Sequence, residues 1–211
     1  MKKIITAALL GLSLNSFADS SPLWLRFCSI APDGQTIAFS YKGDLFSVPA
    51  NGGIAKQLTT NPAYDAYPIW SPDGQKIAFA STREGSMDIY LMNKNGGVPK
   101  RLTTNSGSEI PMAFTDNNHV LFSSAIMPTA KSIFFASGTF PQTYEVNIDA
   151  SRPRLYSPIT MCDANVKSNG DILYHDVKGY EDNFRKHHRS PVTRDIWLYS
   201  KGNYTKLTNF D

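Results

Sequence analysis

Short apolar runs, separated by turn residues, follow one another along most of this chain. In Lys76–Ser81 the large side chains Ile77 and Phe79 are two residues apart, which is the spacing of a half-buried strand. Pro-Asp-Gly precedes this run, and these residue types favour a tight turn because Pro fixes φ, Asp accepts a local amide hydrogen bond and Gly adopts positive φ. The pattern predicts short antiparallel strands joined by tight turns.

The same pattern returns at a fixed interval. Residues 31–40 (APDGQTIAFS) recur as residues 71–80 (SPDGQKIAFA), forty positions later, and each copy leads through Asn-Gly-Gly to Leu-Thr-Thr-Asn. The hairpin signal Asn95-Gly96-Gly97 predicts a primed turn before the fourth strand, and the basic Lys100–Thr103 suits an outer sheet edge. Each unit is therefore predicted to hold four strands, which in the second unit are Tyr67–Ser71, Lys76–Ser81, Asp88–Met92 and Lys100–Thr103.

Two further units are more diverged. The third contains Phe114–Ser123 and Tyr144–Ile148, and the fourth ends with Arg194–Tyr199 and the predicted hairpin Lys201-Gly202-Asn203. Their additional residues, 125–142 and 176–193, fall between second and third strands, which predicts insertions on one face of the assembly.

Repeated four-stranded antiparallel units are the blades of a β-propeller. The sequence predicts an all-β fold, a propeller domain over residues 19–211 with an incomplete ring of about four blades, at about 24–61, 66–105, 110–157 and 158–211. A single β-sandwich is disfavoured because it gives no reason for the two turn signals to recur in step. Closed propellers have about four to eight blades, so we expect the beginning of a longer protein, and a self-contained four-bladed ring is the alternative.

The first eighteen residues are predicted to be a signal peptide, outside the fold. Met1-Lys2-Lys3 is basic, residues 4–14 are an apolar stretch too short to span a membrane, and Ser16-Phe17-Ala18 predicts cleavage after Ala18. The expected location is the periplasm, with no membrane span. The 21 Lys and Arg and 18 Asp and Glu give a net charge of +3, and loss of Lys2 and Lys3 leaves 19 against 18, or +1, so no nucleic-acid partner is predicted.

The chain has two cysteines, Cys28 and Cys162, which would meet an oxidising environment after export. They fall near the first strands of the first and fourth units, which face each other across a six-bladed ring. A disulfide needs Cα atoms within about 7 Å, so two free, largely buried thiols are expected.

The second unit resembles a known repeat. Ser71–Phe79, Asp88-Ile89-Tyr90 and Arg101-Leu102-Thr103 are similar to the propeller repeat shared by TolB and by tricorn-type proteases. Four other segments resemble the N-terminal propeller of exported tricorn-like peptidases, and with them the resemblance covers essentially the whole chain, leader included. These segments are Pro22–Arg26, Ser40–Leu45, Phe114–His119 and Lys178–Asp182.

The resemblance implies a role within a serine peptidase that trims oligopeptides. This propeller would filter access, while a PDZ-like domain and a catalytic domain with Ser and His would lie downstream in the same polypeptide. The expected partners are peptides or proteins, and the complete protein could be a homo-oligomer. No catalytic residue of the family has a counterpart in this chain. A TolB-like protein-interaction propeller and the propeller of a prolyl-oligopeptidase-type hydrolase are the alternatives.

The candidate chemical groups in the sequence favour structural roles. His187 and His188, considered together with His175, predict no metal site, because adjacent histidines rarely converge on one ion without a third fixed ligand. The basic loop Phe184–Arg189 is expected to attract acidic groups at a channel mouth. No cofactor is predicted, since Asn51-Gly52-Gly53 is a turn and no phosphate-binding loop is present. Substrate-binding residues are not assigned. Ser123, Ser124 and Ser137 (with Gly138) are expected to be ordinary strand or loop serines. Asp33, Asp73 and Asp116 are expected to cap turns. The aromatic side chains at strand positions are expected to form the core between blades; these are Phe39, Trp70, Phe79, Tyr90, Phe122 and Trp197.

Overall fold

Sixteen β-strands form four antiparallel sheets in the part of this protein that the structure describes. The structure, a computed structural model, describes residues 24–126, 141–176 and 194–209, and within these ranges there is no helix. Each sheet contains four strands consecutive in sequence, so the predicted all-β fold of four-stranded antiparallel blades is confirmed. The strands are β1 (Arg26–Ile30), β2 (Thr36–Tyr41), β3 (Asp44–Pro49), β4 (Lys56–Gln57), β5 (Asp65–Trp70), β6 (Lys76–Glu84), β7 (Ser86–Asn93), β8 (Lys100–Arg101), β9 (Glu109–Phe114), β10 (His119–Ser124), β11 (Gln142–Asn147), β12 (Arg154–Ser157), β13 (Cys162–Val166), β14 (Ile172–His175), β15 (Ile196–Ser200) and β16 (Asn203–Lys206).

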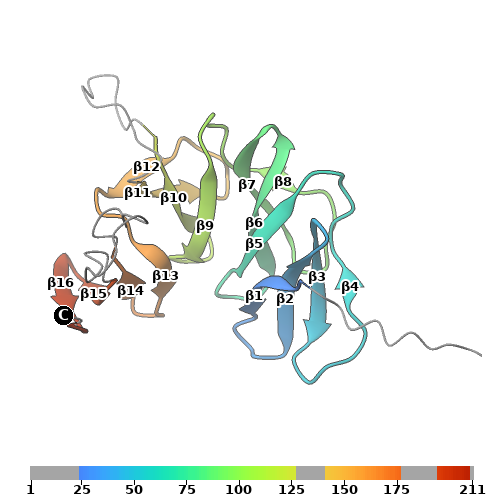
Figure 1. The fold of residues 1–211 in the computed structure, drawn as a ribbon, viewed down its shortest axis with the longest axis horizontal. Helices are drawn as coiled ribbons and strands as arrows, with labels where there is room; N and C mark the ends of the chain where they lie inside the picture. The colour runs from blue at the N-terminus through green and yellow to red at the C-terminus, as the bar shows by residue number, and fades with distance from the viewer. Residues whose placement is uncertain (1–23, 127–140, 177–193, 210–211) are drawn as a thin grey trace, which may run out of the picture.

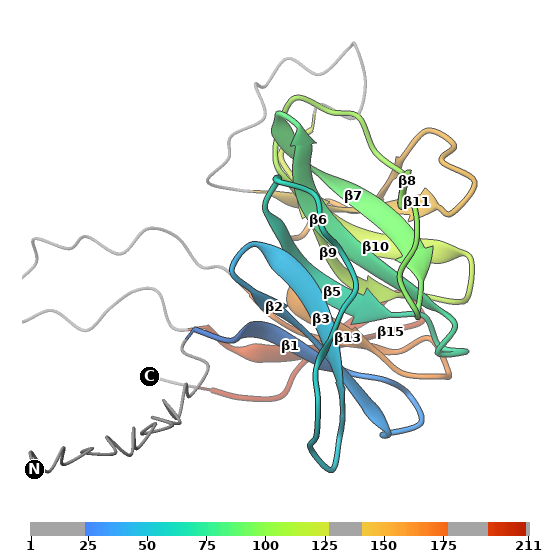
Figure 2. The same cartoon turned by 90° about the vertical axis from the view of Figure 1, so that its right-hand side faces the viewer.

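The four sheets are arranged as propeller blades around a common axis. The first strand of each sheet is innermost, and the short fourth strand is at the outer edge (Figure 1). Neighbouring blades meet along their first strands, β1 with β5, β5 with β9 and β9 with β13, and the perpendicular view also places β1, β5 and β9 close together (Figure 2). The first and fourth blades are at the two ends of the arc, and no contact of similar extent joins β1 to β13 in the part of the chain that is described.

Apolar side chains pack between blades. Phe79, fully buried, belongs to a cluster with Leu45 of the first blade, whereas Ala78 on the opposite face of the same strand packs with Phe122 of the third blade. This arrangement follows from the strand, because successive side chains point to opposite faces and both faces of an inner blade are covered. A fully buried side chain of this size stabilises the fold by about 1.5–3 kcal/mol, so each blade depends on its neighbours.

The predicted inter-blade position of Phe39 is not tested by the described residues. Ala38 packs in the cluster between the first and second blades, so Phe39, the next residue, faces the other side of the first blade. There it stacks on Phe46, with ring centroids 5.9 Å apart. The other five predicted aromatic side chains do contribute to inter-blade clusters; these are Trp70, Phe79, Tyr90, Phe122 and Trp197.

The three aspartates of the turns between first and second strands act as local caps, as expected. The carboxylates of Asp33, Asp73 and Asp116 accept a hydrogen bond from the backbone amide two residues later, over 2.9, 3.0 and 2.7 Å. Gly74 completes its turn with φ of 65°. The hydrogen bond from the Ser71 hydroxyl, followed by the Gln75 amide bond, lowers the pKa of Asp73 below its usual range.

The two predicted hairpins differ. At Lys201-Gly202 two residues with φ of 47° and 86° join β15 to β16, as a primed turn requires. Between β7 and β8 the connection spans residues 94–99, so a primed turn at Asn95-Gly96-Gly97 is wrong. This loop instead reaches the first blade, where the Lys56 ammonium donates to the Asn95 carbonyl over 3.1 Å.

A polar clasp joins the third and fourth strands in three of the blades. The hydroxyls of Thr59, Thr103 and Thr208 each accept a backbone amide hydrogen bond over 2.9 Å, from the residue that follows an Asp near the start of the third strand. That Asp also contacts a side chain of the fourth strand, as in the 2.7 Å ion pair of Asp88 with Arg101. The clasp holds the short outer strand, which has few ladder hydrogen bonds of its own. Its members are Asp44, Gln57 and Thr59; Asp88, Arg101 and Thr103; and Asp195, Lys206 and Thr208.

Candidate functional site: the axial cavity

Each innermost strand has an irregularity at the same place. The pairing of β1 with β2 shifts between Arg26 and Ser29, that of β5 with β6 between Ala66 and Ile69, and that of β13 with β14 between Cys162 and Asn165. In the third blade the shift skips Met112 of β9. A bulge of this kind reorients a side chain, here on the strand nearest the axis.

The bulges surround a cavity of about 790 Å³ at the axis. Its volume is within the range of small-molecule and peptide pockets. The wall from the first three blades is largely apolar, whereas the fourth blade contributes polar and charged side chains. The lining residues used below are Phe27, Tyr67, Met112, Asp163, Asn165 and His175.

The polar side of the cavity contains an acid–histidine pair. The Asp163 carboxylate is 2.8 Å from His175 Nε2, and Asp163 is 90% exposed, so the pair is open to solvent. The Nδ1 atom of His175 lies 3.2 Å from the Asp176 carbonyl, which occupies the second ring nitrogen. Both ring nitrogens of His175 therefore have partners, which fix the orientation of the ring.

Both cysteines line this cavity, so the expectation of largely buried thiols is wrong. Cys28 is exposed and Cys162 is partly exposed, while both are free, as predicted. The reason is their place on innermost strands, whose side chains reach the axis instead of a neighbouring blade. Burial, followed by the nearby Asp163 carboxylate, raises the pKa of the Cys162 thiol, which disfavours a nucleophilic thiolate.

The serines noted in the sequence are placed as ordinary strand residues. Ser123 lines the cavity, and the buried Ser124 hydroxyl donates to the Ser108 carbonyl over 3.1 Å. In the described part of the chain neither has a histidine as a hydrogen-bond partner. Ser137, Gly138 and the basic loop with His187 and His188 lie outside the described residues, and across those that are described no group of three His, Cys, Asp or Glu side chains is placed to hold a metal ion.

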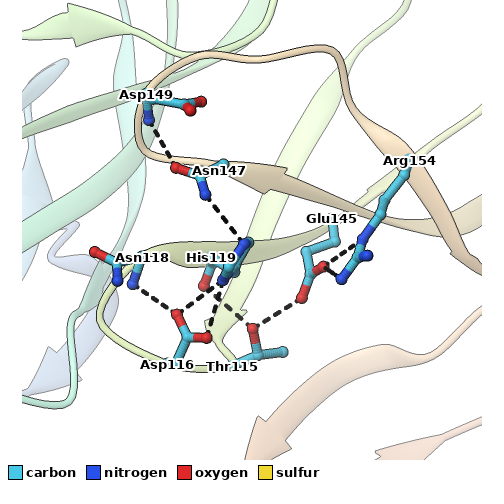
Figure 3. A network of polar contacts seen from close by, with 8 residues as sticks. All are labelled: Thr115, Asp116, Asn118, His119, Glu145, Asn147, Asp149 and Arg154. Atoms are coloured by element: carbon cyan, nitrogen blue, oxygen red, sulfur yellow. Dashed lines mark hydrogen bonds and ion pairs between the residues drawn. The ribbon is translucent and has the colours of Figure 1, made fainter.

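A polar network on the third blade is structural. His119 Nδ1 is 2.9 Å from Asp116, and His119 Nε2 is 3.1 Å from the Asn147 amide nitrogen (Figure 3). Because an amide nitrogen only donates, Nε2 accepts and the proton is on Nδ1, toward the carboxylate. Nearby, Glu145 accepts from Thr115 over 2.9 Å and from Arg154 over 2.8 Å. Both ring nitrogens of His119 therefore form contacts that join the β9–β10 turn to β11.

Two groups of residues were not identified from the sequence. The channel-facing residues at the bulges have no signal of their own, because a bulge depends on the register of the partner strand. Glu109, at the start of β9, is fully buried, and neither of its carboxylate oxygens has a hydrogen-bond partner among the described residues. Burial raises its pKa to about 7, an effect that the neighbouring Asp88 carboxylate adds to.

The fold and the site together define a β-propeller whose innermost strands line an axial cavity. In the described residues no helix is long and apolar enough to cross a membrane. Residues 22–211 match the family described as the tricorn protease N-terminal β-propeller domain. Because this match includes nearly all of the chain, the protein belongs to that family.

Individual relatives agree with this assignment. Over 72 residues the chain is 36% identical to tricorn protease homolog 1 of Streptomyces coelicolor, a stretch that is 34% of this chain and 7% of that protein. A protein assigned as TolB from Agrobacterium tumefaciens has a TM-score of 0.62 and 25% identity, with coverage of 84% of this chain and 62% of that one. The tricorn protease structure has a TM-score of 0.64 and 21% identity, with coverage of 88% and 18%. This chain thus spans less than two thirds of each of these proteins.

Proposed function

We propose that this chain is the non-catalytic propeller region of an exported tricorn-like serine peptidase, where it binds or gates oligopeptides for a peptidase domain of the same polypeptide. The family match over residues 22–211 is the observation that carries the proposal. A signal peptide over residues 1–18 would direct the protein to the periplasm, and a PDZ-like domain would lie between propeller and peptidase.

The lining of the axial cavity is suited to an extended peptide ligand. Its wall consists of strands at the inner edges of their sheets, so each presents one row of main-chain groups without a ladder partner. Such groups hydrogen-bond to an extended peptide, and the apolar side chains of the first three blades would accept peptide side chains. The catalytic serine and histidine are assigned to the downstream domain.

The test uses the polypeptide encoded by the complete gene. Asn165, exposed on β13, lines the cavity, so Asn165→Trp would narrow it without filling the blade interior. We expect kcat/KM for a fluorogenic decapeptide to fall by about tenfold, a loss of about 1.4 kcal/mol in transition-state stabilisation, with little change for a fluorogenic dipeptide. Asn203→Trp, on the exposed outer strand β16, is the control.

Each part of the proposal has its own contrary result. Equal effects of Asn165→Trp on both substrates would show that the cavity does not gate by size. A wild-type protein that cleaves neither substrate would remove the peptidase assignment.

The similarity to the Agrobacterium TolB structure supports a second candidate, a protein-interaction propeller without peptidase activity. In that case the complete gene would end soon after the ring closes. A prolyl-oligopeptidase-type enzyme would instead carry a Gly-x-Ser-x-Gly motif downstream.

A further inference from the structure

Backbone strain recurs at equivalent places on the wall of the axial cavity. Seven non-glycine residues in the described ranges have positive φ, and three of these occupy matching bulges of innermost strands: Phe27, Tyr67 and Asp163, with φ of 53°, 55° and 49°. Aromatic residues rarely adopt this conformation, which costs on the order of 1–3 kcal/mol and is found mainly at functional sites. Strain repeated at equivalent positions of three blades indicates a shared purpose for the side chains that it orients.

Two of these side chains form one aromatic surface. Phe27 of the first blade and Tyr67 of the second lie with ring centroids 3.9 Å apart and planes inclined by 38°. Both rings line the cavity and both are half-buried, so part of the pair is accessible from the axis. Because the rings come from different blades and each is fixed by a bulge, the pair is ordered before a ligand arrives.

The opposite side of the cavity is polar. Asp163, in the same strained conformation on the fourth blade, is paired with His175, and the exposed Arg194 also lines this side. Both signs of charge are therefore present on this side of the cavity. It favours a ligand with polar main-chain groups over a ligand with a large net charge. The cavity thus has an aromatic side and a polar side at the same level of the axis.

We propose that Phe27 and Tyr67 form a selectivity site for an aromatic side chain of an extended peptide in the axial cavity. The inference rests on the proposed peptide-binding function and adds the class of side chain that is preferred. A peptide ring would stack on the pair, while neighbouring peptide groups face Asp163 and His175. Stacking of one more ring contributes binding free energy in addition to that of the buried area. This corresponds to a severalfold preference for an aromatic side chain over an aliphatic or small one.

The experiment measures peptide binding by fluorescence anisotropy with the complete protein. The probes are two fluorescein-labelled Gly-Ser decapeptides that differ only in one central residue, Phe in one and Ala in the other. We expect the Phe peptide to bind about fivefold to tenfold more tightly. Phe27→Asn and Tyr67→Asn should each abolish most of this preference, since Asn adopts positive φ readily but lacks the ring. Tyr204→Asn, which removes an exposed ring from the outer strand β16, should leave it unchanged.

The possible results separate this inference from the proposed function. Equal binding of both peptides by the wild-type protein, or an undiminished preference in both cavity variants, would overturn the aromatic selectivity while leaving peptide binding intact. Binding of neither peptide would overturn the selectivity together with the peptide-binding function. Circular dichroism identifies a variant that has not folded, and the second cavity variant then decides the outcome.

Discussion

The buried Glu109 should make the stability of this propeller fall as pH rises. Its carboxyl is fully buried between the second and third blades, both oxygens are without a hydrogen-bond partner in the described structure, and burial raises its pKa from 4.5 to about 7. The charged groups around it are Asp88 of β7, which raises its pKa further, and Arg101 of β8, which lowers it; the Thr103 hydroxyl also lowers it. We predict that Glu109→Gln, which imitates the protonated carboxyl, removes this pH dependence.

The sign and size follow from linkage. The folded-state pKa is above the unfolded value, so the protonated group contributes fully below pH 4.5, and this stability is lost as pH rises to about 7. A difference of about 2.5 pH units corresponds to a total loss of about 3 kcal/mol, at about 1.4 kcal/mol per unit. Between about pH 5.5 and pH 8 the loss is about 2 kcal/mol, because part of it has already occurred below that range.

The assay is urea unfolding followed by tryptophan fluorescence at these two pH values. We expect the wild-type free energy of unfolding to decrease by about 2 kcal/mol more than that of Glu109→Gln, and the variant to be the more stable protein at pH 8. Glu84→Gln is the matched control, because it removes an exposed carboxylate at the end of β6. The reasoning is refuted if the wild type and Glu109→Gln show the same pH dependence, or if the variant is less stable at pH 8.

Three further predictions concern stability and processing. Asp73→Ala should lower the free energy of unfolding by about 1 kcal/mol through loss of the turn cap, and an unchanged urea midpoint would contradict the cap. Arg83→Gln should cost about 3 kcal/mol, because it removes the 2.7 Å ion pair of the fully buried Asp65 carboxylate. Arg154→Gln should cost under about 1 kcal/mol, because its guanidinium is 72% exposed and Glu145 keeps the hydrogen bond from Thr115; equal losses would show that burial of the cation does not decide the outcome. The N-terminal sequence of the protein expressed in a bacterium should begin at the residue after Ala18, whereas an intact Met1 would exclude the predicted cleavage.

The repeat made the fold predictable. Pro-Asp-Gly and the alternation of Ile77 and Phe79 act over a few residues, so both the turns and the second strands follow from local chemistry. The two insertions also lie where the sequence placed them, since β10 ends at Ser124 before β11 begins at Gln142, and β14 ends at His175 before β15 begins at Ile196. The clasp could also have been predicted from the sequence, because Asp-Ile and Leu-Thr recur at matching places in the second and fourth units.

The axial site was not predictable in the same way. Which residue of Tyr67-Pro68 faces the axis depends on a register shift against β6, and no local preference of Tyr for positive φ reveals it. Glu109 reads as the polar start of a strand, yet the second and third blades enclose it completely. Phe39 is a different case, since it faces the side of the first blade that no described blade covers, and its inter-blade position stays a prediction. All of these cases depend on how strands and blades pack together, which involves residues distant in the chain.

The strands of each blade have different roles, and this explains why the side chains of the axial wall can vary with function. The clasps join third and fourth strands, and most side chains of the inter-blade clusters come from second and third strands, so changes there alter stability directly. The bulged segment of the innermost strand lines the axial cavity, and three blades share a bulge with positive φ but carry different side chains there: Phe27, Tyr67 and Asp163. A constant backbone with a variable side chain is the arrangement expected of a recognition surface supported by a rigid scaffold. The cost of holding aromatic residues at positive φ is offset by the packing of the blades, and this strain would be unnecessary if the axis served only to close the ring.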